Sequence, residues 1–297
     1  MRSYPFLTVD VFTGDRFGGN PLAVILDARG LSDREMQQLA TEFNYAESTF
    51  VLPPDNPAHT AKVRIFNRVN EMPFAGHPNV GTALVLAWTR QGLGDQLVFE
   101  EKAGLVHITL GRGAGGVAES ASINAPEALS TGVTLPVETI ASCLGLAPSD
   151  IRTGTHPPMS ASVGMPFVHV EVSPDALSRT VPQPGPWQQT LERYREELNR
   201  ELAVFHYAHA GNGKLRARMF APEMGIWEDA ATGSASAALV ALLLSRSEAP
   251  ELVLDISQGV EMGRPSRIAA RAWRTGEGIR SSVAGGAVTV FRGEAML

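Results

Sequence analysis

The chain has 297 residues, enough for two domains, and its 44% hydrophobic and 19% charged residues form an ordinary globular composition. Its 25 basic and 31 acidic residues give a net charge of −6 with no lysine or arginine cluster, which argues against nucleic acid or an anionic membrane as a partner. The single cysteine, Cys143, excludes an internal disulfide and every mechanism that needs two thiols in one chain.

The N-terminal residues, MRSYPFLTVDVF, alternate like a strand and lack the apolar run of a signal peptide. The longest apolar stretch, 235–244, is too short to span a bilayer. We therefore expect a cytoplasmic location and no membrane partner.

The first half of the chain predicts short strands around two helices. Ser32 and Glu35 form a capping box for a helix that ends at Asn44. In a second helix, His77 stands at the cap position, Pro78 in the first turn and Gly92 at the stop. The predicted strands cover 6–12, 22–26, 48–52, 61–66, 97–101 and 105–110.

The second half repeats this outline after a segment, 124–136, that resembles a linker. A short helix at 137–144 places Cys143 in the core, and Trp187, Leu191, Tyr194 and Leu198 mark an amphipathic helix that we expect only in this half. Asp229 is the predicted N-cap of a helix whose residues 235–244 are almost entirely apolar. The predicted strands cover 162–172, 202–208, 215–220, 252–257, 268–273 and 287–291.

This pattern predicts an α+β protein with one sheet curled around a buried helix in each half. We place the domains at 1–125, which the C-terminal strand in 286–297 would complete, and at 126–285. A buried helix start presents unpaired N–H groups and partial positive charge, so it binds a carboxylate or phosphate unless its own cap satisfies it. Two such starts could face one small acidic ligand.

Other motifs indicate neither a metal nor an organic cofactor. The glycines of GRGAGG, 111–116, join strand to strand with no lysine following, so a hairpin turn is the better interpretation than a phosphate loop. His206 and His209 lack a third ligand at metal spacing and are predicted to face the core or the solvent. No GxSxG nucleophile elbow is present.

Five strings resemble one family over essentially the whole chain. They are GGNPLAV, NYAESTFVLP, EMPFAGHPNVGTA, RMFAPEMGIWEDAATGSASAAL and QGVEMGRPS, in this order, and they are similar to the phenazine-biosynthesis isomerase (PhzF-like) family. The resemblance implies a diaminopimelate-epimerase-like fold of two similar domains with the active site in the cleft between them. It also implies no metal, no organic cofactor and a homodimer.

The same resemblance implies the site residues. Glu47 matches the family's acid/base glutamate; His77, Asp229 and Ser234 match the other polar site residues, and Gly76 and Gly233 the donors of backbone N–H groups. Asn20 is a turn residue or a substrate contact. A carboxyl in an apolar cleft has its pKa raised toward neutrality, so it can take and return a proton, while donors at helix starts stabilise an enolate-like charge.

Each residue has a plainer alternative. Glu47 could be a surface residue, His77 and Asp229 could be helix caps, and Ser234 could satisfy its own first turn. The chain also departs from the family pattern: Ala230 stands where proline is usual, and the segment before Glu71 lacks the common Thr-Pro.

Three hypotheses follow for the function. The leading one is a cofactor-independent isomerase that moves a proton between carbons of a small carboxylic acid. A second is an epimerase or racemase of an amino or hydroxy acid without thiols. A third is a non-catalytic protein that binds an anionic metabolite. The sequence does not distinguish a phenazine-pathway substrate from other small acids, so the generic isomerase is preferred.

Overall fold

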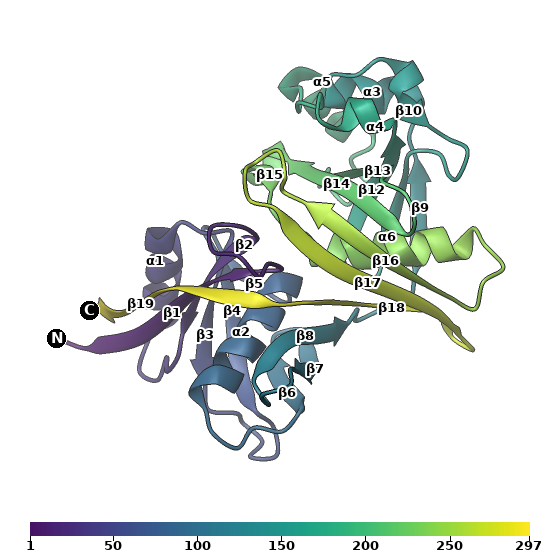
Figure 1. Ribbon diagram of the computed structural model, residues 1–297. Helices are drawn as coiled ribbons and strands as arrows, with labels where there is room; N and C mark the ends of the chain where they lie inside the picture. Colours follow the sequence, from purple (N-terminus) through teal and green to yellow (C-terminus); the bar gives the residue numbers. More distant parts are fainter. The chain divides into compact units, whose positions relative to one another are not determined.

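The computed structural model describes residues 1–297, which form two compact units. Unit 1 comprises Met1–Asn124 and Ala284–Leu297, and unit 2 comprises Ala125–Val283. Each unit is a mixed, mainly antiparallel sheet wrapped around one buried helix, as Figure 1 shows for α2 and α6. The predicted α+β class with two similar sheet-and-helix halves is confirmed.

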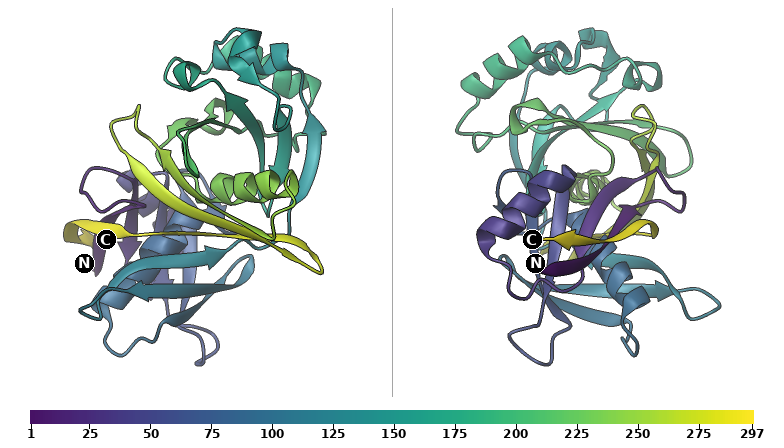
Figure 2. Two further views of the ribbon diagram at one scale, coloured as in Figure 1. Left: turned by 45° about the vertical axis from the view of Figure 1, so that its right-hand side comes forward. Right: turned by 90° about the vertical axis from the view of Figure 1, so that its left-hand side faces the viewer.

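The sheet of unit 1 has the order β19–β1–β2–β3–β4–β6–β7–β8, with the short β5 on β4. The pairs β2–β3 and β4–β6 are parallel and the others antiparallel. Figure 2 shows β19 beside β1, with the two chain termini together. The strands are β1 (Ser3–Val11), β2 (Asn20–Ile25), β3 (Glu47–Leu52), β4 (Ala61–Asn67), β5 (Glu71–Met72), β6 (Gln96–Glu101), β7 (Gly104–Arg112), β8 (Ala118–Asn124) and β19 (Ala287–Met296).

Unit 2 repeats this order as β9–β11–β12–β13–β14–β16–β17, with β15 on β14 and β10 on β12. The parallel pairs, β12–β13 and β14–β16, occupy the same places as in unit 1. The strands are β9 (Ser130–Thr134), β10 (Ile151–Arg152), β11 (Met159–Ser162), β12 (Pro166–Val172), β13 (Val204–His209), β14 (Lys214–Ala221), β15 (Ile226–Asp229), β16 (Glu251–Gln258), β17 (Ser266–Thr275) and β18 (Gly278–Gly285). The second unit is therefore a structural repeat of the first.

The central helices are α2 (Gly76–Thr89) and α6 (Gly233–Ser245), each buried over most of its length. Close packing of α2 requires a glycine, because a Cβ atom at Gly81 would lie 2.6 Å from the Leu22 side chain and 2.7 Å from that of Val11. The helix is apolar on every side, which is what a helix enclosed by a sheet requires.

The remaining helices cover the outer parts of the units. In unit 1, α1 (Asp33–Phe43) begins with the predicted Ser32–Glu35 capping box and ends at Asn44. In unit 2, α3 (Val137–Leu144), α4 (Pro174–Leu177) and α5 (Pro184–Arg193) form a second core around Trp187 that includes the buried Cys143. Two short 3-10 turns complete the set, η1 (Pro148–Asp150) and η2 (Pro222–Met224).

Several predicted boundaries were wrong. The N-cap of α2 is Ala75 rather than His77, and α2 ends at Thr89, before Gly92. The N-cap of α6 is Thr232, because Asp229 belongs to β15 and pairs with Met219. The predicted linker contains β9.

The amphipathic helix of the second half was also misjudged. It ends at Arg193 rather than extending to Leu198. It has a counterpart in the first half as well, since α4 and α5 lie between β12 and β13 just as α1 lies between β2 and β3.

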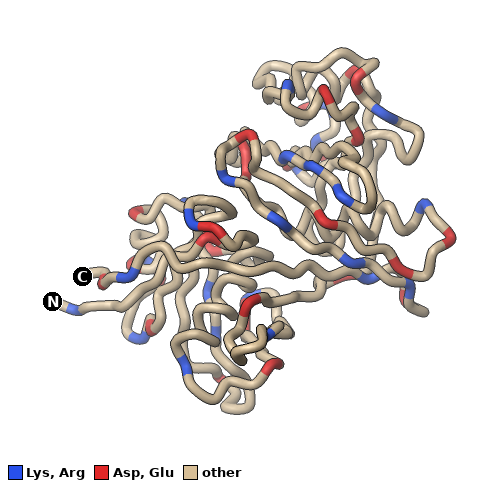
Figure 3. The backbone as a smooth tube through the Cα atoms, viewed as in Figure 1, with Lys and Arg blue, Asp and Glu red and all other residues tan.

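The charge pattern agrees with the composition. Figure 3 shows basic and acidic residues interspersed along the chain in both units. None of the helices combines the length and the apolar character needed to cross a bilayer.

Candidate active site

Glu47 and His77 meet inside unit 1. Glu47 is the first residue of β3, and His77 is the second residue of α2. The Glu47 Oε2 atom lies 3.3 Å from the His77 Nε2 atom, and the two side chains are 16% and 6% exposed. The alternatives of a surface Glu47 and a capping His77 are therefore wrong.

Asn20 contacts the other nitrogen of this imidazole. It is buried at the start of β2, and its Nδ2 atom lies 3.4 Å from His77 Nδ1. With the Asn20 amide nitrogen as the donor, Nδ1 is the acceptor and a neutral ring carries its hydrogen on Nε2, an atom that lies near Glu47 but makes no hydrogen bond. Burial lowers the pKa of His77 to about 3, so the ring is neutral at pH 7.

The start of α2 carries backbone donors beside this pair. Its N-cap, Ala75, makes no side-chain capping bond, and its first turn holds no acidic residue. Gly76 is buried as the first helical residue, immediately before His77. Neither a capping side chain nor an acidic residue of the first turn therefore offsets the partial positive charge at the start of α2.

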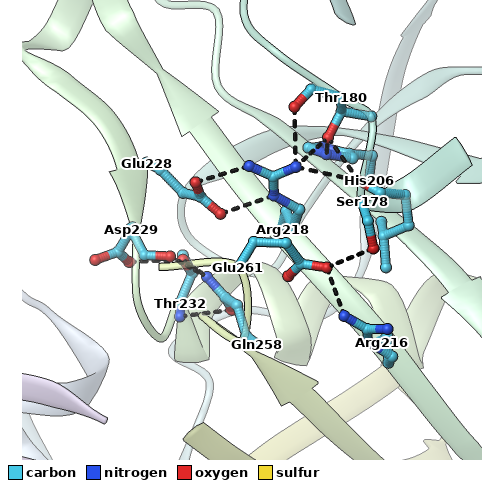
Figure 4. A network of polar contacts seen from close by, with 11 residues as sticks. Ser178, Thr180, His206, Arg216, Arg218, Glu228, Asp229, Thr232, Gln258 and Glu261 are labelled. Atoms are coloured by element: carbon cyan, nitrogen blue, oxygen red, sulfur yellow. Dashed lines mark hydrogen bonds and ion pairs between the residues drawn. The ribbon is translucent and has the colours of Figure 1, made fainter. Parts of the chain in front are cut away.

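In unit 2, Asp229 closes β15 just before α6 (Figure 4). The Thr232 hydroxyl donates to Asp229 Oδ2 at 2.6 Å. Gln258, fully buried at the end of β16, accepts from the Thr232 N–H at 2.9 Å and donates to Asp229 O and to Thr232 Oγ1, both at 2.9 Å. Gly233 is buried as the first residue of α6, and Ser234, the second, is partly exposed. Asp229 is thus not a cap, and its loop is held by Gln258.

A buried ion pair supports the residue before Asp229. Arg218 donates to Glu228 through Nε at 2.8 Å and through Nη2 at 2.9 Å, and its Nη1 donates to Thr180 Oγ1 at 2.8 Å (Figure 4). Thr180 Oγ1 in turn lies 2.9 Å from His206 Nε2. Planar guanidinium and carboxylate groups match each other in this arrangement, which fixes the Glu228 side chain.

The structure places the predicted residues in two groups. Glu47, His77, Asn20 and Gly76 lie together in unit 1, and Asp229, Gly233 and Ser234 lie around the start of α6 in unit 2. His206 is buried and His209 exposed, and no group of three or more His, Cys, Asp or Glu side chains could hold a metal ion.

Three supporting residues escaped the sequence analysis, namely Thr232, Arg218 and Gln258. All three stand inside the strings that carry the family resemblance. For Arg218 and Gln258 that position was the only available signal, because their partners are brought to them by the sheet.

Comparisons with known proteins agree with the fold. Residues 9–293 match the family described as phenazine biosynthesis-like protein. An uncharacterized isomerase of Mesorhizobium japonicum is 38% identical over 99% of both chains. A trans-2,3-dihydro-3-hydroxyanthranilate isomerase of Pseudomonas aeruginosa is 37% identical over 98% of this chain and 99% of its own.

Solved structures extend this comparison. A PhzF-family phenazine biosynthesis protein of Bacillus anthracis superposes with a TM-score of 0.88 at 26% identity, covering 100% of both chains. A hydroxyproline epimerase of Agrobacterium vitis superposes with a TM-score of 0.65 at 12% identity, covering 100% of this chain and 93% of its own, which is a likeness of fold alone.

Proposed function

Because the chain belongs to the phenazine biosynthesis-like (PhzF-like) family and is an isomerase, we propose that it moves a proton between two carbons of a small carboxylic acid, with Glu47 as general acid/base. The observation that carries the proposal is the 3.3 Å contact between Glu47 Oε2 and His77 Nε2. No cofactor enters the proposed reaction.

The state of His77 assigns the roles within this pair. Burial disfavours a charged imidazole, so His77 is a poor acceptor for a substrate proton. A carboxyl group, in contrast, can take a proton from one carbon and return it to another. Glu47 is therefore the proton carrier, and the neutral His77 lies beside its carboxyl group, at 3.3 Å.

The helix starts supply the second part of the proposal. Loss of a proton beside a carboxylate places negative charge on the substrate oxygens, and N–H groups fixed at a helix start stabilise that charge without reorganising. We assign this role to Gly76 and to Gly233, with Ser234 as a further donor. Asp229, an acceptor, suits a hydroxyl or amino group of the substrate.

The relatives support a proposal for the substrate class. One relative of similar length is a trans-2,3-dihydro-3-hydroxyanthranilate isomerase, and the compound in this name is a small unsaturated carboxylic acid. We propose a substrate of this general class, handled in the cytoplasm by a homodimer. Light scattering at several protein concentrations tests the dimer, and a constant monomer mass would contradict it.

The decisive variant is Glu47→Gln, which keeps the size of the side chain and removes its proton transfer. We expect at least about a 100-fold loss of turnover, the scale of a general acid/base contribution. Glu42→Gln, at an exposed position of α1, is the control and should retain full activity. Activity of Glu47→Gln within a few-fold of the parent would show that another group carries the proton.

The substrate is found by incubating the parent protein with a panel of small unsaturated and amino acids in deuterated water. Mass spectrometry and NMR then locate any deuterium. Deuterium at a new position with a displaced double bond supports the isomerase proposed here, whereas exchange at one stereocentre with inversion identifies an epimerase. Retention of an unchanged ligand indicates a binding protein.

A further inference from the structure

The repeat makes Glu101 and Gln258 equivalent residues. Glu101 ends β6, which follows α2, and Gln258 ends β16, which follows α6. The interval from Gly76 to Glu101 along the chain equals the interval from Gly233 to Gln258. Each of the two strands is also the parallel partner of the long strand two places before it, β4 for β6 and β14 for β16, with a short strand and the central helix in between.

Gln258 shows what this position does in unit 2. Its side-chain amide both accepts and donates: Oε1 accepts from the Thr232 N–H, and Nε2 donates to Thr232 Oγ1 and to Asp229 O. Thr232 is the N-cap of α6. An uncharged side chain with one acceptor and one donor group thus fixes the start of the central helix.

In unit 1 the same position holds a carboxyl group with no such partners. Both oxygens of Glu101 are buried and make no hydrogen bond. Asn79, in the first turns of α2, lies beside Glu101; its amide partly opposes the rise in the pKa of Glu101 without reaching hydrogen-bond geometry, and its Oδ1 atom is likewise buried without a donor. Its Nδ2 donates to the carbonyl of Ala75, the N-cap of α2, at 3.0 Å. The pair is therefore rich in buried acceptors and short of a donor.

The charged groups around Glu101 are engaged elsewhere. Lys62 binds Asp55 at 2.7 Å, Arg64 binds Glu71 at 2.7 Å, and Lys102 also lies nearest Glu71, at 3.9 Å. Glu100 accepts from the backbone N–H groups of Asp55 and Asn56 and from His59. The residues that line one surface groove with Glu101 include Asp55, Lys62, Arg64, Glu71, Glu100 and Lys102. His77 is the titratable side chain on the first turn of α2.

From this equivalence we infer that Glu101 is a neutral carboxylic acid that positions the start of α2, including His77, as the amide of Gln258 positions the start of α6. Its O–H supplies the donor that the buried pair lacks, and its carbonyl oxygen remains an acceptor. Burial, which raises the pKa of Glu101 to about 8, agrees with this state. The effect on catalysis rests on the function proposed above, whereas the effect on folding does not.

The first test is the pH dependence of unfolding by urea for the parent and for Glu101→Gln, whose amide imitates the neutral acid. Between the pKa of the carboxyl group in the unfolded chain and about pH 8, only the folded parent holds the Glu101 proton. The ratio of the parent's unfolding constant to the variant's should therefore rise about tenfold per pH unit in this range. Parallel profiles for the two proteins would overturn the inference.

The second test separates a positioning role from a merely structural one. Above about pH 8 the parent should lose kcat while KM changes less, and Glu101→Gln should keep its kcat over the same range. The matched variant Gln258→Glu should introduce the same kind of pH-dependent unfolding in unit 2. A parent and a Glu101→Gln variant with the same kcat profile would contradict the positioning role.

Glu47→Gln distinguishes failure of this inference from failure of the proposed function. Combined with Glu101→Gln, it allows the pH dependence of unfolding to be measured in proteins without the assigned acid/base. Suppose that Glu47→Gln and the double variant unfold with different pH dependences, and that Glu47→Gln remains active. The acid/base assignment is then wrong, and the inference that Glu101 is a positioning carboxylic acid stands. If the two proteins unfold with the same pH dependence and Glu47→Gln is inactive, the acid/base assignment stands and the inference about Glu101 is wrong.

Discussion

Arg218 donates two parallel hydrogen bonds, at 2.8 and 2.9 Å, to Glu228, the residue that precedes Asp229. Both side chains are nearly buried, at 9% and 11% exposure. The pair ties β14 to β15, whose last residue carries the carboxylate that we assign to substrate binding.

Replacing this arginine should be costly. Arg218→Met leaves Glu228 as a buried, unpaired charge, and we expect a loss of about 3–5 kcal/mol in the free energy of unfolding. Arg216→Met is the control, because the Arg216–Glu261 pair is more exposed and such pairs contribute about 1 kcal/mol or less. Urea unfolding at pH 7 measures the loss of stability in each variant. Equal losses would show that the Arg218–Glu228 pair contributes no more to stability than the more exposed pair.

Three buried histidines predict sensitivity to acid. Burial lowers the pKa of His77, His169 and His206 to about 3, helped at His169 by His156 and at His206 by Arg218. The unfolded chain therefore binds protons that the folded chain excludes, and stability falls as the pH drops from about 6.5 toward 3. Each histidine contributes about 1.4 kcal/mol per pH unit in this window.

Removing one of them should flatten the profile. In His169→Gln we expect about one proton fewer to be taken up on unfolding between pH 6 and 5, so the unfolding free energy should depend less steeply on pH. This expectation holds whatever the variant does to stability at pH 7. NMR provides a direct check, since the ring signals of His77 should not titrate between pH 5 and 8. A midpoint inside that range would contradict the neutral His77 on which the assignment of roles depends.

The packing of α2 against β1 and β2 predicts a third effect. A methyl group added by Gly81→Ala would lie too close to Leu22 and Val11, and we expect about 1–3 kcal/mol of destabilisation from overpacking. Gly94→Ala is the matched control, because no atom lies within 4 Å of its Cβ position. Thermal unfolding of the two variants separates the cases, and a stable Gly81→Ala would mean that the sheet yields easily around the helix.

The elements that the sequence located best are those with local signals. The Ser32–Glu35 capping box and the αL residue Asn44 define α1 by themselves, so both ends were predicted correctly. The starts of α2 and α6 were misplaced because helices that are apolar on every side have no stripe to mark a first turn.

The support of the site depends instead on the sheet. Gln258 reaches Thr232 only because β16 lies parallel to β14, and no short-range pattern reports that neighbour. The contact of Glu47 with His77 likewise joins a strand to a helix through the packing of α2 on β3. Family resemblance identified the residues, whereas the neutral imidazole and the Asn20 contact required coordinates.

The pairing of β1 with β19 has a consequence for biosynthesis. One edge of β1 pairs with β2, but its other edge pairs only with Ala287–Met296, which is translated after all of unit 2. The residues of unit 2 are all translated earlier, so this unit can fold while unit 1 still lacks β19. A chain truncated before residue 287 should therefore keep unit 2 resistant to proteolysis and leave β1 more accessible to the protease than in the full chain.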